Sequence, residues 1–219
     1  MKEKYSAGEN PASDKNKIYV RYIAVTGILS AAAFALQLIE IPLPMLIPSF
    51  IKFDFSDLPA LIGAFSLGPV CGVMIQFLKN LLHASVSTTS FVGELSNFLL
   101  GSVFVGSAGI IYKFKKTKKG AVIAAFAGAL LMAAAALPLN YFIVYPFYYN
   151  FIPEKTILAA YQAILPGMKS IFQSLICFNV PFTFAKGVAD AVVTFIIYKR
   201  ISPLLKGKTD REKTRHTED

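Results

Sequence analysis

The chain has 219 residues, of which 55% are hydrophobic and 16% are charged, and its formal net charge is +9 at pH 7. Its mean hydropathy of +0.55 excludes an ordinary soluble domain, because such domains carry a larger share of polar residues. Nucleic-acid binding is also excluded, since the basic residues stand at the ends of apolar segments and form no basic patch interleaved with aromatic residues. The composition therefore predicts an integral membrane protein, in which the positions of the basic residues indicate the loops that face the cytoplasm.

The first apolar segment follows a polar stretch, residues 1–18, and it ends without the small-residue cleavage signature of a secretory signal. We expect residues 1–18 to be a retained cytoplasmic segment and residues 19–39 to form the first membrane helix. Residues 41–49 are rich in proline, which cannot continue a helix. A long loop is therefore predicted after the first helix.

Residues 58–77 fit either one membrane span or two short helices, because Gly68 and Pro69 stand near the centre. Charge decides between the two, since Lys and Arg concentrate in the cytoplasmic loops of membrane proteins. Most of the 22 Lys and Arg residues lie in three groups, at residues 1–21, 113–119 and 199–215. A turn at Gly68 brings all three groups to one side, so two helices are predicted.

The remaining apolar windows complete an all-α membrane domain, residues 19–202, with six transmembrane helices and both termini in the cytoplasm. The helices are expected at about 19–39, 57–67, 70–84, 92–112, 120–148 and 180–201. The fifth is an uncharged run of ~45 Å, longer than a ~30 Å hydrocarbon core, so a bend is expected at Pro138. Residues 150–178 are predicted to form an outer segment able to act as a lid, and residues 203–219 a charged, disordered cytoplasmic tail.

Polar residues at membrane depth are the informative ones, because their burial in lipid is costly and usually serves a function. No nucleotide-binding loop or zinc-protease motif occurs, so catalysis by this chain alone is not expected. The polar residues are Lys79, Glu94, Asn97, Asn140, Asn179, Lys186 and Asp190. Asn179, Thr183 and Lys186 recur at helical spacing and share one face. A polar cavity open to the outside is the expected consequence.

Two of these residues also have purely structural explanations. Asn179 stands just before a proline and is explained equally well as a cap of the last helix. For Lys186, the alternative to a ligand contact is an ion pair with Asp190 one turn away.

Other residues near the outer helix ends are expected to be mainly structural. Lys79 is predicted to pair with Glu94 or Asp57, and His83 to form an interfacial hydrogen bond. The Tyr and Phe residues at 141–151 are predicted to form an interfacial belt, with one or two of them facing the cavity and stacking on a flat ligand.

Small residues recur every four positions on the first helix, at Gly27, Ala31 and Ala35. Such a ridge lets another helix approach closely in lipid. Packing within this chain and packing against a partner subunit explain the ridge equally well.

The sequence becomes recognisable after the first helix. Residues 49–63 (SFIKFDFSDLPALIG), 79–83 (KNLLH) and 93–98 (GELSNF) resemble the substrate-binding S components of energy-coupling factor (ECF) vitamin transporters, above all the riboflavin-specific members. The resemblance implies the S-component fold, a multi-pass protein of the bacterial plasma membrane, and an outward-facing vitamin site near the loop after the first helix. It also implies as partners riboflavin, a transmembrane coupling protein that contacts the small residues of the first helix, and two ATPase subunits.

The resemblance extends to the residues that hold the vitamin. In riboflavin-specific members an Asn in a Pro-Leu-Asn-Tyr segment contacts it, and this residue is Asn140 here. A Pro-Phe-Asn-x-x-Lys segment supplies further contacts; Lys186 matches its Lys, but Thr183 replaces its Asn. Either Asn179 supplies the amide from one turn earlier or the contact differs. The expected ligand-binding residues are Leu43, Met45, Glu94, Asn97, Asn140, Asn179, Thr183 and Lys186.

The ligand chemistry agrees with riboflavin, a neutral flat heterocycle that needs amides and hydroxyls at its edge and apolar or aromatic faces. Thiamine, a cation, would favour Trp faces, and the chain has no Trp. Folate would require several cationic groups. Another vitamin or heterocycle, such as a flavin analogue, is the alternative within the family, and a membrane channel or intramembrane enzyme ranks behind both. Neither a resident cofactor nor a metal site is expected.

Overall fold

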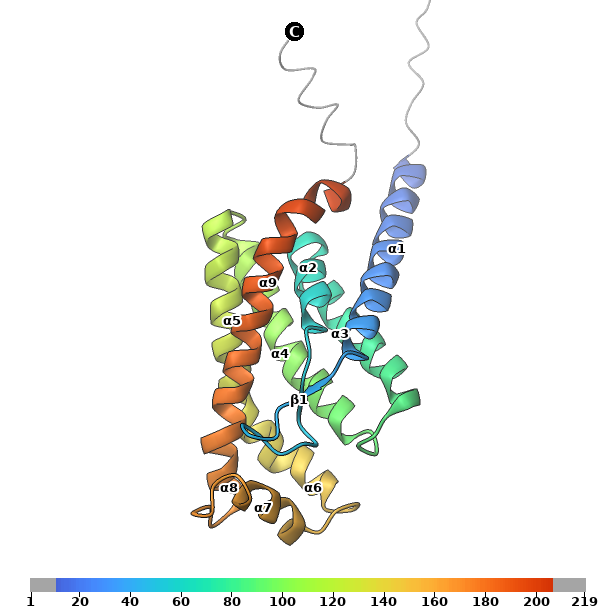
Figure 1. Ribbon diagram of the computed structural model, residues 1–219. Coiled ribbons are helices and arrows are strands. Elements are labelled where there is room, and N and C mark those ends of the chain that lie inside the picture. Colours follow the sequence, from blue (N-terminus) through green and yellow to red (C-terminus); the bar gives the residue numbers. More distant parts are fainter. Residues whose placement is uncertain (1–10, 207–219) are drawn as a thin grey trace, which may run out of the picture.

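The computed structural model describes residues 11–206, so the predictions for residues 1–10 and 207–219 lie outside the described residues. Within that range nearly all of the regular structure is helical, as predicted (Figure 1). The helices are α1 Pro11–Gln37, α2 Asp57–Leu67, α3 Pro69–His83, α4 Val92–Phe114, α5 Lys118–Leu139, α6 Tyr145–Tyr148, α7 Glu154–Gln162, α8 Ile171–Ser174 and α9 Val180–Lys206. The tail predicted from residue 203 thus begins inside the last turn of α9.

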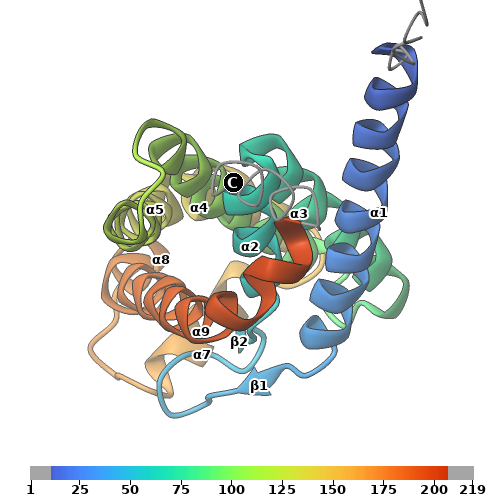
Figure 2. The same cartoon turned by 90° about the horizontal axis from the view of Figure 1, so that it is seen from above.

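The first helix is longer at its start than predicted, since α1 begins at Pro11 rather than near residue 19. Proline is favoured in the first turn of a helix, where its missing N–H breaks no hydrogen bond. α1 stands at the edge of the bundle (Figure 2) and contacts α3 and α2. The Gln37 amide donates to Asn80 Oδ1 of α3 at 3.0 Å, a buried contact that anchors the end of α1.

Residues 41–56, called here the cover segment, connect α1 to α2. They contain two short strands, β1 Ile41–Pro42 and β2 Lys52–Phe53, which pair antiparallel with Ile41 opposite Phe53. The sequence did not predict these strands. Their pairing closes the cover segment into a loop that lies between α9 and α1 (Figure 2).

The predicted break between α2 and α3 is confirmed. Gly68 has a φ of 103°, a conformation that residues with a Cβ rarely adopt, and Pro69 occupies the first turn of α3. The two short helices contact each other closely, and Gly72 makes this possible because a Cβ there would lie 2.8 Å from Ala64 Cβ.

α5 continues through a π-helical turn, Asn140–Val144, into α6. In this turn the Tyr145 N–H donates to the Asn140 carbonyl, five residues back. Pro138 lies inside α5, just ahead of the turn. The α6 end of the helix slants across the lower end of the bundle in Figure 1, where the sequence predicted a bend.

The last helix begins earlier than predicted. α8, a π-helical turn Leu175–Asn179 and α9 follow one another without a gap, so the helix starts at Ile171 rather than near residue 180. The Val180 N–H donates to the Leu175 carbonyl. This wider turn lets the chain pass Pro181 without ending the helix, because the hydrogen-bond register shifts where proline lacks its donor.

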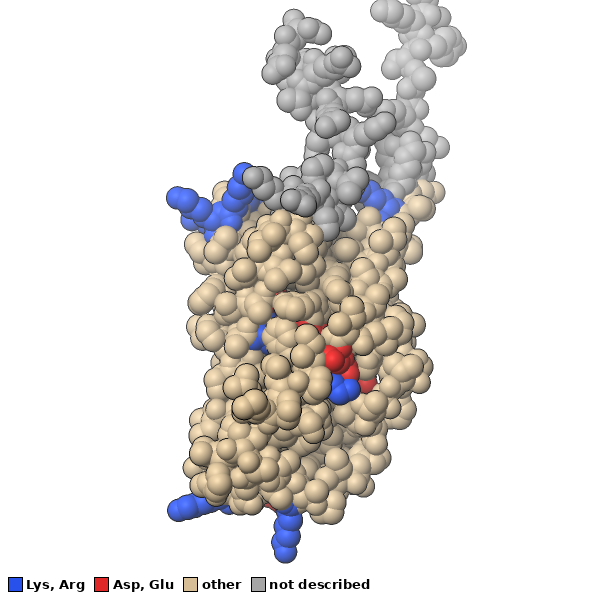
Figure 3. All heavy atoms as spheres, viewed as in Figure 1, with Lys and Arg blue, Asp and Glu red and all other residues tan. Residues whose placement is uncertain are grey.

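Four helical stretches in the described part of the chain are long and apolar enough to cross a membrane: Tyr19–Gln37, Val92–Phe114, Lys118–Tyr148 and Ile171–Ile197. α2 and α3 are shorter, and α2 is almost wholly buried among the others. In Figure 3, Lys and Arg gather at the two ends of the molecule, and a further group of charged atoms lies midway between them. Apart from this group, the visible surface between the two ends is uncharged, which is typical of a surface that faces lipid.

Candidate ligand-binding site

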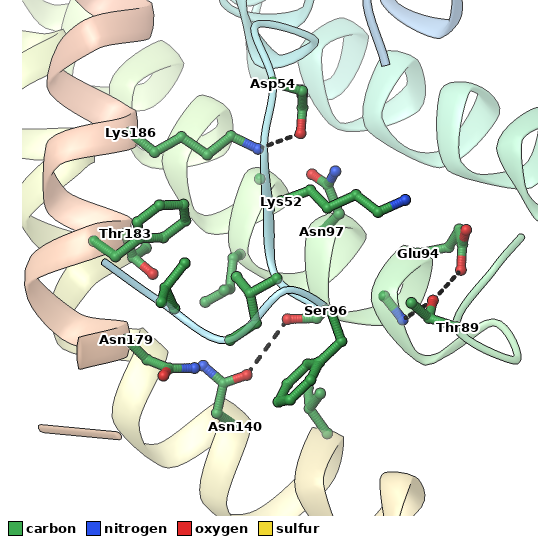
Figure 4. A pocket seen from close by; sticks show the side chains of 18 of the residues that line it. Lys52, Asp54, Thr89, Glu94, Ser96, Asn97, Asn140, Asn179, Thr183 and Lys186 are labelled. Atoms are coloured by element: carbon green, nitrogen blue, oxygen red, sulfur yellow. Dashed lines mark hydrogen bonds and ion pairs between the residues drawn. The ribbon is translucent and has the colours of Figure 1, made fainter. Parts of the chain in front are cut away.

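A cavity lies between α4, α5, α9 and the cover segment, with about 910 Å³ of empty space including its open mouth (Figure 4). Six of the eight residues predicted to contact a ligand line this cavity. They are Glu94, Asn97, Asn140, Asn179, Thr183 and Lys186.

Leu43 and Met45, the other two predicted contacts, are not among the lining residues, and Met45 is 87% exposed. The tight turn of the cover segment explains this, since the N–H groups of Leu46 and Ile47 both donate to the Leu43 carbonyl. The turn directs Ile47, which is fully buried, into the cavity in their place. From this segment Ile47, Phe50 and Ile51 supply the apolar lining of the cavity.

A buried ionic cluster forms one end of the cavity. Lys186 Nζ lies 2.9 Å from Asp54 Oδ2 and 3.6 Å from Asp57 Oδ2. Burial alone would raise the pKa of Asp54, but Lys186 and Lys79 together hold it below its ordinary value, so the carboxylate stays charged. The ion pair with Asp190, considered as the alternative for Lys186, is not formed, because Asp54 of the cover segment and Asp57 of α2 lie closer. Asp190 makes no hydrogen bond with any described residue.

Lys79 completes this cluster from α3. Its ammonium donates to Asp57 Oδ1 and to Ser56 Oγ, both at 2.6 Å, which confirms the predicted pair with Asp57. The Gln76 amide also donates to Asp57, at 2.8 Å. The cluster therefore ties α3 and α9 to the start of α2, and a buried cation or carboxylate without such partners would be strongly destabilising.

Amides form the opposite end of the cavity, and each lies in one of the two π-helical turns. Asn140 is the first residue of the turn after α5, and Asn179 is the last residue of the turn before α9. Figure 4 shows their side chains pointing toward one another below Thr183. Because the helix continues on both sides of Asn179, this residue is not the helix cap that the sequence allowed. π-Helical turns often occur at functional sites.

Glu94 also lines the cavity, and its buried carboxylate is held by groups of this chain. Ser87 Oγ donates to it at 2.8 Å, Thr89 Oγ1 at 3.3 Å, and His83 Nδ1 lies 2.8 Å away. The hydrogen-bonding role predicted for His83 is thereby confirmed. Nearby, Lys52 of the cover segment forms an ion pair with Glu40. These contacts organise the connection between α3 and α4.

Apolar and aromatic side chains supply the faces of the cavity. Phe50, Tyr148 and Phe182 line it, together with Ile47 and Met132. The rings of Phe50 and Tyr148 pack with their centroids 5.6 Å apart. Sequence reasoning named the aromatic group at 141–151 but missed Phe50, although that residue lies inside the recognisable motif 49–63.

The small residues Gly27, Ala31 and Ala35 lie on the exposed side of α1. A Cβ added at Gly27 would meet nothing within 4 Å. Packing within the described part of this chain therefore does not explain the ridge.

The chain was compared with known proteins. The family described as "ECF transporter, substrate-specific component" matches residues 21–198. The chain belongs to this family. The protein named riboflavin transporter RibU, from Staphylococcus aureus (strain TCH60), is 34% identical over 179 residues, which cover 82% of this chain and 89% of that protein. Riboflavin transporter FmnP of Bacillus subtilis (strain 168) is 29% identical over 85% of this chain and 95% of its own length.

A solved structure supports the same fold. It is described as the S component of a bacterial ECF transporter, shares 30% identity, and aligns with a TM-score of 0.68 over 86% of this chain and 99% of its own. The relatives are named transporters and not enzymes. This chain is therefore a membrane transport protein with the S-component fold.

Proposed function

We propose that this S component binds riboflavin outside the cell and delivers it across the bacterial plasma membrane, with energy supplied by ATP hydrolysis in partner subunits. The observation that carries the proposal is the cavity, which combines amide and hydroxyl groups with aromatic and apolar faces. That combination fits a neutral flat heterocycle with a polyol tail. The riboflavin transporters among the relatives, which match over most of the chain, support the same ligand.

In this proposal Asn140, Asn179 and Thr183 hydrogen-bond the vitamin, and Phe50 and Ile47 cover its ring. Asn97 is half-buried beside them. Lys186 has already committed its ammonium to Asp54 and Asp57; its remaining N–H is the donor available to the ligand. Glu94 acts by shaping the wall of the cavity, since its carboxylate is engaged by His83, Ser87 and Thr89.

The proposed topology has six membrane helices, with both termini and the connection between α4 and α5 in the cytoplasm. Its support is the clustering of basic residues. Lys113, Lys115, Lys116, Lys118 and Lys119 lie at or beside this connection, at the same end of the molecule as the start of α1 and the end of α9 (Figure 1). Positive charge marks the cytoplasmic side, so α6 to α8 would face outward with the cavity beneath them.

The proposed partners are a transmembrane coupling protein and two ATPase subunits. The exposed ridge of Gly27, Ala31 and Ala35 is the proposed contact with the coupling protein, because small residues allow close helix packing in lipid. None of the three ridge residues lines the cavity, so partner contact and ligand binding can be tested separately.

Titration of purified protein with riboflavin tests the proposed ligand. We expect saturable quenching of riboflavin fluorescence at one vitamin per chain, no competition by thiamine or folate, and a yellow colour for protein purified from its host membrane. Mass spectrometry of the co-purified ligand would identify any other heterocycle. Protein that is folded, carries a different vitamin and leaves riboflavin fluorescence unchanged would contradict the proposal.

A further inference from the structure

The outer helix α7 reaches the wall of the cavity through one buried residue, Tyr161. Its side chain is fully buried, and its hydroxyl donates to Asn179 Oδ1 at 2.6 Å. The Asn179 amide nitrogen in turn donates to the Tyr145 hydroxyl at 3.3 Å. Tyr145 and Tyr161 are hydrogen-bonded to each other through their hydroxyls.

These three hydrogen bonds form a closed ring with one consistent direction. Because Tyr161 uses its single proton toward Asn179, the bond between the two hydroxyls must be donated by Tyr145. Burial, together with the neighbouring Tyr145, raises the pKa of Tyr161 well above its ordinary value, so its hydroxyl keeps that proton. Each hydroxyl in the ring therefore donates once and accepts once.

The ring holds the Asn179 side chain in place. Both polar atoms of its amide are engaged by a tyrosine hydroxyl in a buried setting, where an unmade hydrogen bond costs about 1–3 kcal/mol. In the observed orientation Nδ2 has a second hydrogen that the ring does not use.

Asn140 presents the same kind of group from the facing turn. Its Oδ1 accepts from Ser96 Oγ at 3.4 Å, so its amide nitrogen is left for the cavity. Both Asn140 and Asn179 line the cavity, whereas Tyr161 does not. The amide end of the site thus offers two N–H donors side by side (Figure 4).

We propose that Tyr161 is a positioning residue, which acts from α7 to hold Asn179 as an N–H donor toward the acceptor atoms of a flat heterocycle. The inference rests on the proposed function and deepens it, because carbonyl oxygens and unprotonated ring nitrogens are the acceptors that such an edge carries. The inference also gives the segment that contains α7 a role in ligand recognition. The vitamin is held by an amide whose side chain is fixed in place by a residue of α7, which does not line the site.

The test compares Tyr161→Phe, Asn179→Ala and the double variant by quenching of riboflavin fluorescence. We expect Tyr161→Phe to weaken binding about tenfold, the usual order for losing one oriented hydrogen bond, and to have no further effect once Asn179 is alanine. Tyr141→Phe is the matched control, because Tyr141 is 40% exposed and does not line the cavity. The affinity of this variant for riboflavin should equal that of the wild type. Additive losses in the double variant would overturn the proposal, since a role confined to stability predicts them.

Asn179→Asp provides a second test if Tyr161→Phe does not fold. This variant still accepts a hydrogen bond from Tyr161 but lacks the N–H donor, so we expect riboflavin binding to fall at least tenfold. Unchanged affinity would overturn the inference. Wild-type protein is titrated first, so that failure of the proposed ligand is seen there and is distinguished from failure of the positioning role.

Discussion

Lys186 of α9 donates a hydrogen bond to Asp54 of the cover segment across 132 positions of sequence. The contact fastens the end of the cover segment to the last helix, directly beside the cavity. Asp57, at the start of α2, lies on the other side of the same ammonium. The ion pair between Lys186 and Asp54 therefore holds the cover segment in place at one end of the cavity.

Replacing Lys186 with Met tests this fastening. The substitution keeps the length of the side chain but leaves Asp54 buried without its closest cation, so we expect a loss of about 3–5 kcal/mol in unfolding free energy. Thermal unfolding of ligand-free protein in detergent measures the effect. Adding Asp54→Asn to Lys186→Met should recover part of the loss, because the uncompensated charge is then gone. A single variant as stable as the wild type would contradict the role assigned to this pair.

Asn140→Ala should weaken riboflavin binding, because Asn140 is 3% exposed and its amide nitrogen has the ligand as its expected acceptor. The loss of one buried hydrogen bond of this kind costs about 1–3 kcal/mol, or roughly fivefold to more than a hundredfold in affinity. Fluorescence titration measures it. Asn150→Ala is the matched control, since Asn150 is exposed and bonds only backbone carbonyls of its own turn. Equal affinities for the two variants would remove Asn140 from the site.

Two residues of the cover segment make a second matched pair. Ile47 is fully buried and lines the cavity, whereas Met45 is 87% exposed. Truncation of a buried Ile removes about 2 kcal/mol of apolar contact, so Ile47→Ala should weaken riboflavin binding on the order of tenfold or more. Met45→Ala should bind as the wild type does. If Met45→Ala shows the larger loss in fluorescence titration, the cover segment meets its ligand through a different face.

Features set by a few adjacent residues were predictable from the sequence. Gly68 and Pro69 predict the break between α2 and α3 because one favours a positive φ and the other begins a helix well. The shared face of Asn179, Thr183 and Lys186 followed from helical spacing, and all three line the cavity.

The partner of Lys186 was not predictable. Helical spacing allowed a pair with Asp190 as the alternative to a ligand contact, but the folded chain brings Asp54 closer, and no local pattern reports that approach. The π-helical turns were missed as well. Each ends just before an X-Pro step, at Pro146 and Pro181, where a helix needs one hydrogen bond fewer. The two prolines are visible in the sequence, but a proline at position 181 equally predicts the start of a helix.

The ridge on α1 yields a prediction about the partner rather than the ligand. Ala31→Leu with Ala35→Leu would add bulk along an exposed strip where small side chains allow close approach. We expect co-purification with the transmembrane coupling protein to be abolished, while quenching of riboflavin fluorescence stays at the wild-type level, because neither Ala31 nor Ala35 lines the cavity. Ala134→Leu on the exposed side of α5 is the matched control and should leave both readouts unchanged. Undiminished co-purification of the double variant would place the docking surface elsewhere.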